Sequence, residues 1–284
     1  MRLLVGNALP AHAMYGKKEI ETDTARTFFF EMLCIGGLGF AMFWLLKAER
    51  ARVRVTPPSV SDTLDLMKKL VSEPVMKLLC VLSAYSGLIL SFWSGKYFTV
   101  ISGHNESDGD ALTLPGSFTP GAVAIAGMFV AFGEIAGGIL YGRVADKYGR
   151  RIVASASGIC HAIAIVVVNL VVYYGLRLDD DASLRLMLLA GFLLGFGDSG
   201  VSTLMYGLVG ERYPGRNEST PAFAIVKFAQ SLAASIAFMY AGAIPMSAQC
   251  AILLISLSLG VASVYALECN RAKRGARRVA LSSK

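Results

Sequence analysis

Two acidic residues, Glu134 and Asp198, lie near the middle of apolar stretches that are long enough to span a bilayer. A carboxylate at that depth is costly unless it faces a protein interior or a watery cavity. Each residue is therefore a candidate site for a cation, a proton or a polar solute. Two structural alternatives remain open. Glu134 can be a protonated or hydrogen-bonded packing group, and the glycines around Asp198 can form a flexible packing joint. We favour a function for both residues because membrane carboxyls are rare.

A polar stripe on another apolar segment adds to these candidates. Lys227, Gln230 and Ser231 are spaced three and four residues apart, which places them on one face of a helix. Lys227 either extends to the membrane interface or provides the counter-charge for Asp198, and its position favours neither. We include Lys227 and Gln230 in the predicted substrate or ion pathway.

The remaining polar residues in apolar segments have simpler explanations. Lys96 lies near the end of its segment, which favours an interpretation in which its side chain extends to the membrane interface. His161 is predicted to be a packed, hydrogen-bonded histidine. No Cys/His metal spacing, phosphate-binding glycine loop or serine nucleophile elbow is recognisable. We therefore predict a non-enzyme with no catalytic residues, cofactor or metal.

The elements that must position these residues are membrane helices. Mean hydropathy is +0.56, with 55% apolar and 17% charged residues, which excludes a soluble domain. About 20 apolar residues cross the hydrocarbon core as a helix. Seven segments qualify as spans: 27–46, 77–101, 121–141, 152–175, 186–210, 221–243 and 247–267. The prediction is an all-α, multi-pass transmembrane bundle in contact with the lipid bilayer.

The charge of the connecting segments predicts the orientation. Basic residues gather in 47–76, 142–151, 211–216 and 268–284, and acidic residues in 106–110 and 179–181. By the positive-inside rule, residues 1–26 lie outside, 47–76 form a long cytosolic loop, and 268–284 form a basic cytosolic tail. This pattern accounts for the net charge of +7 without a nucleic-acid partner. Asn105 begins a glycosylation sequon on the outer side, and residues 61–71 predict a short helix on the membrane surface.

The segment 142–151 is the most specific local pattern. Gly142, Asp146, Gly149, Arg150 and Arg151 predict a tight cytosolic turn between two spans. Asp146 could accept hydrogen bonds from a helix N-terminus, and the arginines could clamp a carboxylate or a lipid phosphate. An ordinary basic loop that obeys the positive-inside rule remains the alternative.

This decapeptide resembles the loop motif of the major facilitator superfamily, and further motifs resemble its Unc-93-like branch. Those motifs are Gly87-Leu88, Phe92-Trp93-Ser94-Gly95, Gly133 to Gly138, Gly195 to Ser199, and Pro221 to Ser231. The resemblance implies that 77–267 is the six-helix C-terminal half of the fold and 27–46 its preceding span. It also implies that 152–175 and 247–267 are peripheral, while the other four spans of that half line the cavity. The chain departs from the pattern at Ile89 and Lys96, which puts a shared specificity in doubt.

Two functions follow from the residues and the resemblance. The first is a solute transporter, or the C-terminal part of one, that binds its ligand at Glu134 and Asp198. The second is a non-transporting regulator or trafficking partner of an ion channel or receptor. A seven-span receptor is disfavoured, because Glu211-Arg212-Tyr213 follows the fifth span instead of the third. Alternating access needs two repeat-related halves, so transport would require a missing N-terminal half or a homodimer.

Overall fold

The computed structural model describes residues 30, 33–34, 36–42, 59–102, 120–173 and 180–282. Within these ranges the chain is helical and contains no strand, and six helices are long and apolar enough to cross a membrane. The predicted all-α, multi-pass bundle is confirmed. Half of the predicted span 27–46, like the sequon at Asn105, lies outside the described residues.

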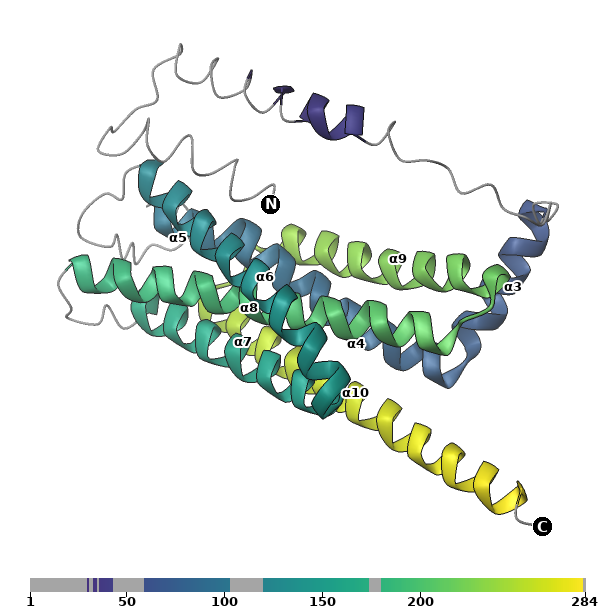
Figure 1. The fold of residues 1–284 in the computed structure, drawn as a ribbon. Helices are drawn as coiled ribbons and strands as arrows, with labels where there is room; N and C mark the ends of the chain where they lie inside the picture. Colours follow the sequence, from purple (N-terminus) through teal and green to yellow (C-terminus); the bar gives the residue numbers. More distant parts are fainter. Residues whose placement is uncertain are drawn as a thin grey trace.

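The main elements follow one another through the bundle (Figure 1). They are α3 (Val60–Ser72), α4 (Pro74–Ser91), the π-helix η1 (Phe92–Tyr97), α5 (Phe98–Ser102), α6 (Pro120–Tyr148), α7 (Arg150–Tyr173), α8 (Asp180–Arg212), α9 (Arg216–Tyr240) and α10 (Met246–Ser282). Together α4, η1 and α5 form a single span from Pro74 to Ser102.

Local sequence explains where several helices begin and end. Pro74 starts α4, a position at which the missing N–H of proline has no helical partner to lose. Gly149, with a φ of 87°, is the single non-helical residue between α6 and α7. A turn between two spans is therefore present as predicted, but it is confined to Gly149, because residues 142–148 continue α6 and Arg150 already begins α7.

Several helices extend beyond the predicted spans. Helix α6 continues to Tyr148, past the predicted end at 141, and α8 begins at Asp180, before the predicted start at 186. The predicted span 221–243 begins five residues earlier, and its helix ends at Tyr240. The predicted span 247–267 lies inside α10, which continues to Ser282. The segment 268–284, predicted as a tail, is thus mostly an extension of a membrane helix, and it leaves the bundle in Figure 1.

The six long helices pack around α8 and α4. Helix α8 contacts α6 on one side and α7 on another, while α4 contacts α9 and α10. A contact between α4 and α8 joins these two groups, and α7 also packs on α10. Helix α8 thus contacts α4, α6 and α7, and it also contacts α9. Residues on its different faces can therefore meet partners from most of the bundle.

Glycines allow α6 and α8 to approach closely. A Cβ placed on Gly133 would lie 2.7 Å from the backbone nitrogen of Phe196, and one on Gly137 would lie 2.8 Å from Ser199 Cβ. Backbones come this close where side chains are absent. The second small-residue pair, Gly138 and Gly142, does not work this way, because a Cβ at Gly142 would meet nothing within 4 Å.

Outward-facing apolar side chains suit a hydrocarbon environment. On α7 they form one helical stripe, and on α10 a shorter one. They are Ile152, Ile159, Ile163, Val166 and Leu170, then Ile252, Ile255 and Leu259. Exposed apolar side chains also occur on α6 and α9, for example Ile139 and Phe228, so exposure alone does not distinguish α7 and α10 as peripheral, and the inner face of α7 carries the buried His161.

Helix α3 packs on α9 and α4 beside one end of the bundle. Its Leu70 is buried and Met67 half-buried, whereas Leu64 and Val71 are exposed. The apolar face predicted for 61–71 is therefore divided between the bundle and the surroundings.

Candidate functional site

Glu134 and Asp198 line the same cavity. Its walls are Glu134 and Ile135 from α6 and Asp198, Ser199 and Ser202 from α8, and its volume is about 360 Å³. Both carboxylates lie well inside candidate membrane spans. The close packing of α6 on α8 brings these two residues, far apart in sequence, to one site.

The Asp198 carboxylate is only partly satisfied. Its Oδ1 atom is buried and has no hydrogen-bond partner among the described residues. The charges that act on this carboxyl are those of Glu134 and Lys227. A buried oxygen without a partner loses solvation energy, which a proton or a bound cation would restore. Two carboxylates and two hydroxyls in one cavity favour a ligand of positive charge.

Lys227 does not form an ion pair with Asp198 in the described part of the chain. Its Nζ donates to Gln230 Oε1 at 2.7 Å and lies 5.0 Å from the centre of the Tyr206 ring. Gln230 Nε2 in turn donates to Ser86 Oγ at 2.9 Å, which ties α9 to α4. The predicted stripe is therefore a polar contact beside the cavity and does not contribute to its wall, and Ser231 is exposed.

His161 is a packed histidine, as predicted. It is fully buried on α7, and its Nε2 lies 3.1 Å from the carbonyl oxygen of Leu194 on α8. Its Nδ1 lies 2.6 Å from the hydroxyl of Tyr85 on α4. Three helices therefore meet at this imidazole.

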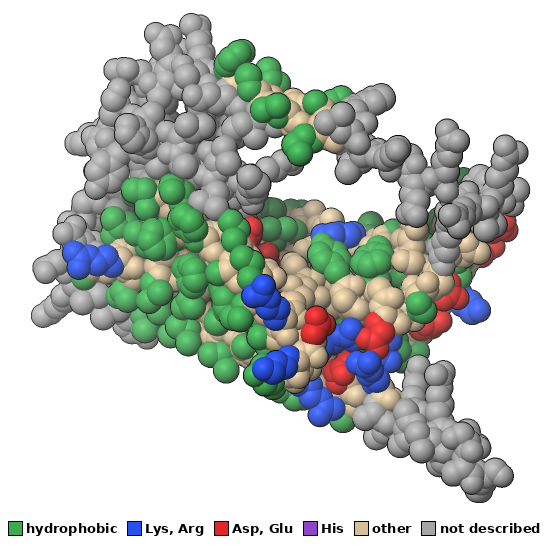
Figure 2. All heavy atoms as spheres, in the orientation of Figure 1, with side chains coloured by type: hydrophobic (Ala, Val, Ile, Leu, Met, Phe, Trp, Pro, Cys, Tyr) green, Lys and Arg blue, Asp and Glu red, His purple; other side chains and the backbone are tan. Residues whose placement is uncertain are grey.

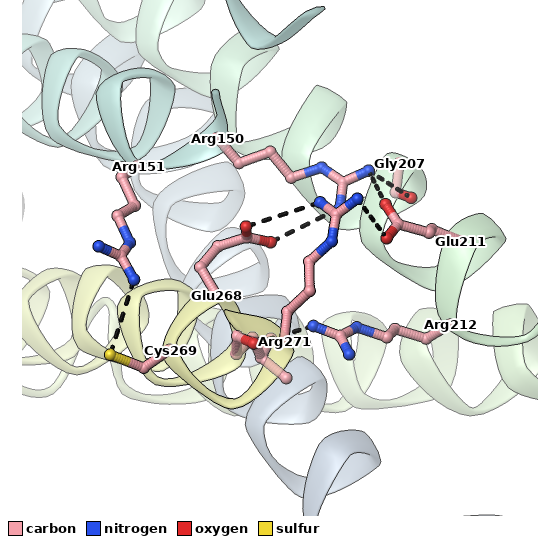
Figure 3. Close-up of polar contacts among 9 residues, drawn as sticks. Arg150, Arg151, Gly207, Glu211, Arg212, Glu268, Cys269 and Arg271 are labelled. Atoms are coloured by element: carbon pink, nitrogen blue, oxygen red, sulfur yellow. Dashed lines mark hydrogen bonds and ion pairs between the residues drawn. The ribbon is translucent and has the colours of Figure 1, made fainter. Parts of the chain in front are cut away.

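A charge cluster occupies the end of the bundle where α6 turns into α7, hereafter the α6–α7 end (Figure 3). Arg150 lies 2.6 Å from Glu211 and 3.6 Å from Glu268, and Arg271 lies 3.1 Å and 3.7 Å from the same two carboxylates. On the face drawn in Figure 2, charged side chains gather where α10 leaves the bundle. The cluster joins the start of α7 to the end of α8 and to the part of α10 that leaves the bundle.

The residues of 142–151 have different roles in this region. Arg150 binds carboxylates of the protein itself, whereas Arg151 Nη2 lies 3.6 Å from Cys269 Sγ and its guanidinium lies 5.7 Å from the centre of the Tyr265 ring. The prediction that Asp146 accepts hydrogen bonds from a helix N-terminus is wrong. Asp146 lies on an exposed face of α6 and makes no hydrogen bond or ion pair within the described ranges.

Several residues at the site were not singled out from the sequence. Ser199 and Ser202 line the cavity, and Tyr85 contacts His161. The serines follow Asp198 by one and four residues, so the sequence alone could have predicted that they lie close to it on one helix. Tyr85 lies 76 residues from His161 and gave no local signal. Within the described chain, no group of three His, Cys, Asp or Glu side chains could hold a metal ion.

Comparisons with known proteins agree with this architecture. A family model described as "Ion channel regulatory protein UNC-93" matches residues 1–265. Proteins named "UNC93-like protein MFSD11" from Xenopus laevis and Xenopus tropicalis are 30% and 29% identical over 303 aligned positions. These alignments cover 96% of this chain and 66% of each relative, so the chain spans about two thirds of their length. No solved structure matches. The chain belongs to the UNC-93 family.

Proposed function

We propose that the chain supplies the six-helix C-terminal half of a facilitator-type membrane transporter, with a cationic solute held between Glu134 and Asp198. The observation that carries the proposal is the shared cavity, in which two carboxylates from neighbouring spans face one space. Solute sites of transporters lie near the bilayer midplane between packed helices, where ionisable groups are otherwise costly.

The size of the cavity favours a small organic cation. A volume of about 360 Å³ falls at the lower end of small-molecule sites, which occupy roughly 300–1,000 Å³. A bare metal ion would leave most of this space to water. A small amine or quaternary ammonium would share this open cavity with water, while the carboxylates bind its charge and Ile135 contacts its apolar part.

The same proposal includes an orientation. The α6–α7 end carries Arg143, Lys147, Arg150 and Arg151, and basic residues favour the cytosolic side. The charge cluster would then lie at the cytosolic end of the bundle, with the N-terminus of the chain outside.

Binding by the purified full chain tests the proposal most directly. Choline serves as the probe, and its effect on the melting temperature is measured at constant ionic strength. A ligand at ten times its Kd stabilises the native state by about 1.4 kcal/mol, so a rise in Tm is expected. Asp198→Asn and Glu134→Gln should abolish the rise. Asp146→Asn, which neutralises an exposed carboxylate on α6, should retain it.

Two results would refute the ligand assignment. One is a wild-type chain whose Tm is insensitive to choline while remaining folded. The other is an Asp198→Asn variant that responds as strongly as the wild type. Choline uptake into vesicles, measured with the same variants, then separates binding from transport.

A regulatory function is the second candidate, because the matching family model describes an ion channel regulatory protein. In this case the bundle would bind another membrane protein, and the carboxylates would support packing. Co-purification of a stable membrane partner, combined with no solute flux from the pure chain, would favour this function. Flux from the pure chain would count against it.

A further inference from the structure

We propose that Tyr85 and His161 are positioning residues for the cavity: together they hold the turn of α8 that carries Asp198. The inference rests on the proposed function, since the ligand that Asp198 meets is the one proposed above. Neither residue lines the cavity, so neither contacts the ligand, and their contacts to the cavity are made through α8.

The hydrogen bonds of the pair determine which imidazole nitrogen carries the proton. The Leu194 carbonyl can only accept, so the nitrogen facing it at 3.1 Å, Nε2, must donate. In a neutral imidazole, Nδ1 is then an acceptor, and the Tyr85 hydroxyl donates to it at 2.6 Å. Both side chains are buried, and such hydrogen bonds to a neighbouring ring fix its orientation.

The pair meets α8 directly beside Asp198. In an α-helix the Leu194 carbonyl also accepts the backbone N–H four residues later, which is that of Asp198. The imidazole lies against Gly197 as well, where an added Cβ would be 2.7 Å from His161 Nε2. His161 therefore contacts α8 at the preceding residue and one turn before the carboxylate.

Tyr85 anchors this contact to the rest of the bundle. Its side chain packs against α10, where a Cβ on Gly260 would lie 3.4 Å from Tyr85 Cβ. The ring of Tyr85 also meets the ring of His161 edge-on, with centres 5.7 Å apart. In addition, the charge of Asp198 acts on the Tyr85 hydroxyl. The pair thus connects one turn of α8 to α4, α7 and α10 through hydrogen bonds and packing contacts.

The chain offers a matched control for a merely structural role. The Tyr97 hydroxyl donates to the carbonyl of Met187 on the same helix at 2.7 Å, and Tyr97 is equally buried. Met187, however, precedes Asp198 by about three helical turns. If the tyrosines only stabilise the fold, Tyr85→Phe and Tyr97→Phe should behave alike.

The experiment uses the purified full chain and two measurements. Choline affinity is measured by titration, and hydrogen exchange is followed by mass spectrometry in peptides around Met187 and Asp198. Tyr85→Phe should weaken choline affinity about tenfold, the scale on which supporting residues around a binding site act. It should also speed exchange near Asp198. Tyr97→Phe should speed exchange near Met187 and change the affinity less than about twofold, since its bond is remote from the site.

Two further variants keep the test valid if Tyr85→Phe folds poorly. Gly197→Ala leaves every hydrogen-bonding group in place but displaces the imidazole, so it should also weaken choline affinity. Gly207→Ala on the same helix, where a Cβ meets nothing within 4 Å, should not. His161→Gln, whose amide can donate and accept, should retain more affinity than His161→Leu.

The outcomes separate this inference from the proposed function. Equal affinities for Tyr85→Phe, Tyr97→Phe and wild type, or unchanged exchange near Asp198, would overturn the positioning role while leaving the cavity assignment intact. If wild type does not bind choline, the assigned ligand is wrong, and exchange near Asp198 alone decides whether the pair holds that turn.

Discussion

Arg150 links three helices, and its removal should measurably destabilise the bundle. As the first residue of α7, it directs its guanidinium to Glu211 on α8 and Glu268 on α10, and it also lies 3.4 Å from the Gly207 carbonyl (Figure 3). Arg150→Ala would leave two carboxylates that share a single remaining cation, Arg271.

The expected loss follows from burial. Breaking a fully buried ion pair costs roughly 3–5 kcal/mol, whereas an exposed pair contributes about 0.2–1 kcal/mol. The side chains of Arg150 and Glu268 are 19% and 14% exposed, and Glu211 is 35% exposed. At 3.6 Å the contact to Glu268 is too long for a hydrogen bond, which leaves the buried Arg150 Nη1 without a hydrogen-bond partner among the described residues. Because the cluster lies between these two limits and Arg271 is retained, we expect Arg150→Ala to lower the free energy of unfolding by about 2 kcal/mol.

Thermal unfolding of the purified chain in detergent measures this loss. Arg143→Ala is the matched control, because Arg143 is exposed and makes no ion pair among the residues the structure describes. Raising the salt concentration should reduce the effect of Arg150→Ala only in part, since salt screens buried pairs weakly. If Arg150→Ala and Arg143→Ala differ by less than about 0.5 kcal/mol, the scale of ordinary surface changes, the reasoning is refuted.

Two further predictions concern helix packing at Gly133, inside a span, and a hydrogen bond of Tyr213, outside the spans. Gly133→Ala should destabilise the chain by about 1–3 kcal/mol in the same assay, because its Cβ would collide with the α8 backbone. Gly142→Ala, whose Cβ would meet nothing within 4 Å, should instead stabilise α6 by up to about 1 kcal/mol, because alanine favours a helix over glycine. Tyr213→Phe should cost about 1 kcal/mol, because the Tyr213 hydroxyl donates to Glu73 Oε2 at 3.0 Å. Burial, and then the bond to Glu73, raise the pKa of Tyr213. Its contribution is therefore complete below the ordinary tyrosine pKa of about 10 and declines above it, so wild type and Tyr213→Phe should converge in stability at alkaline pH.

The helices were predictable from the sequence, but several of their ends were not. Hydropathy marks the part of a helix that crosses hydrocarbon, and it says little once the chain enters water. After residue 267 the sequence turns polar, yet its alanine and arginine residues are good helix formers. Helix α10 therefore continues to Ser282, past the predicted end of its span. Gly149 was readable in advance, because a glycine between two helical segments suits a positive φ.

The candidate site was predictable residue by residue but not as an arrangement. Glu134 and Asp198 attract attention individually because carboxyls are costly in a bilayer. Their meeting depends on glycine contacts between α6 and α8, and a small-residue pattern does not say which helix will approach. Gly142 shows the same limit, because it belongs to a small-residue pair with Gly138 and yet a Cβ placed on it would meet nothing within 4 Å. Likewise, a buried histidine implies hydrogen bonds, but Leu194 lies 33 residues away from His161.

Helix α8 is held by side chains of other helices at three levels, and this arrangement bears on how the proposed transporter would move. The three carbonyl contacts along α8 are Tyr97 to Met187, His161 to Leu194, and Arg150 to Gly207. Asp198 lies between the second and third of these levels. Because the partners come from η1 and α7, α8 cannot shift alone without breaking these bonds, of which those to Met187 and Leu194 are buried. We therefore expect ligand binding at Asp198 to move α8 together with α7 and the span from Pro74 to Ser102, as one rigid half-bundle. Rocking of such a half against another is the motion that alternating access requires.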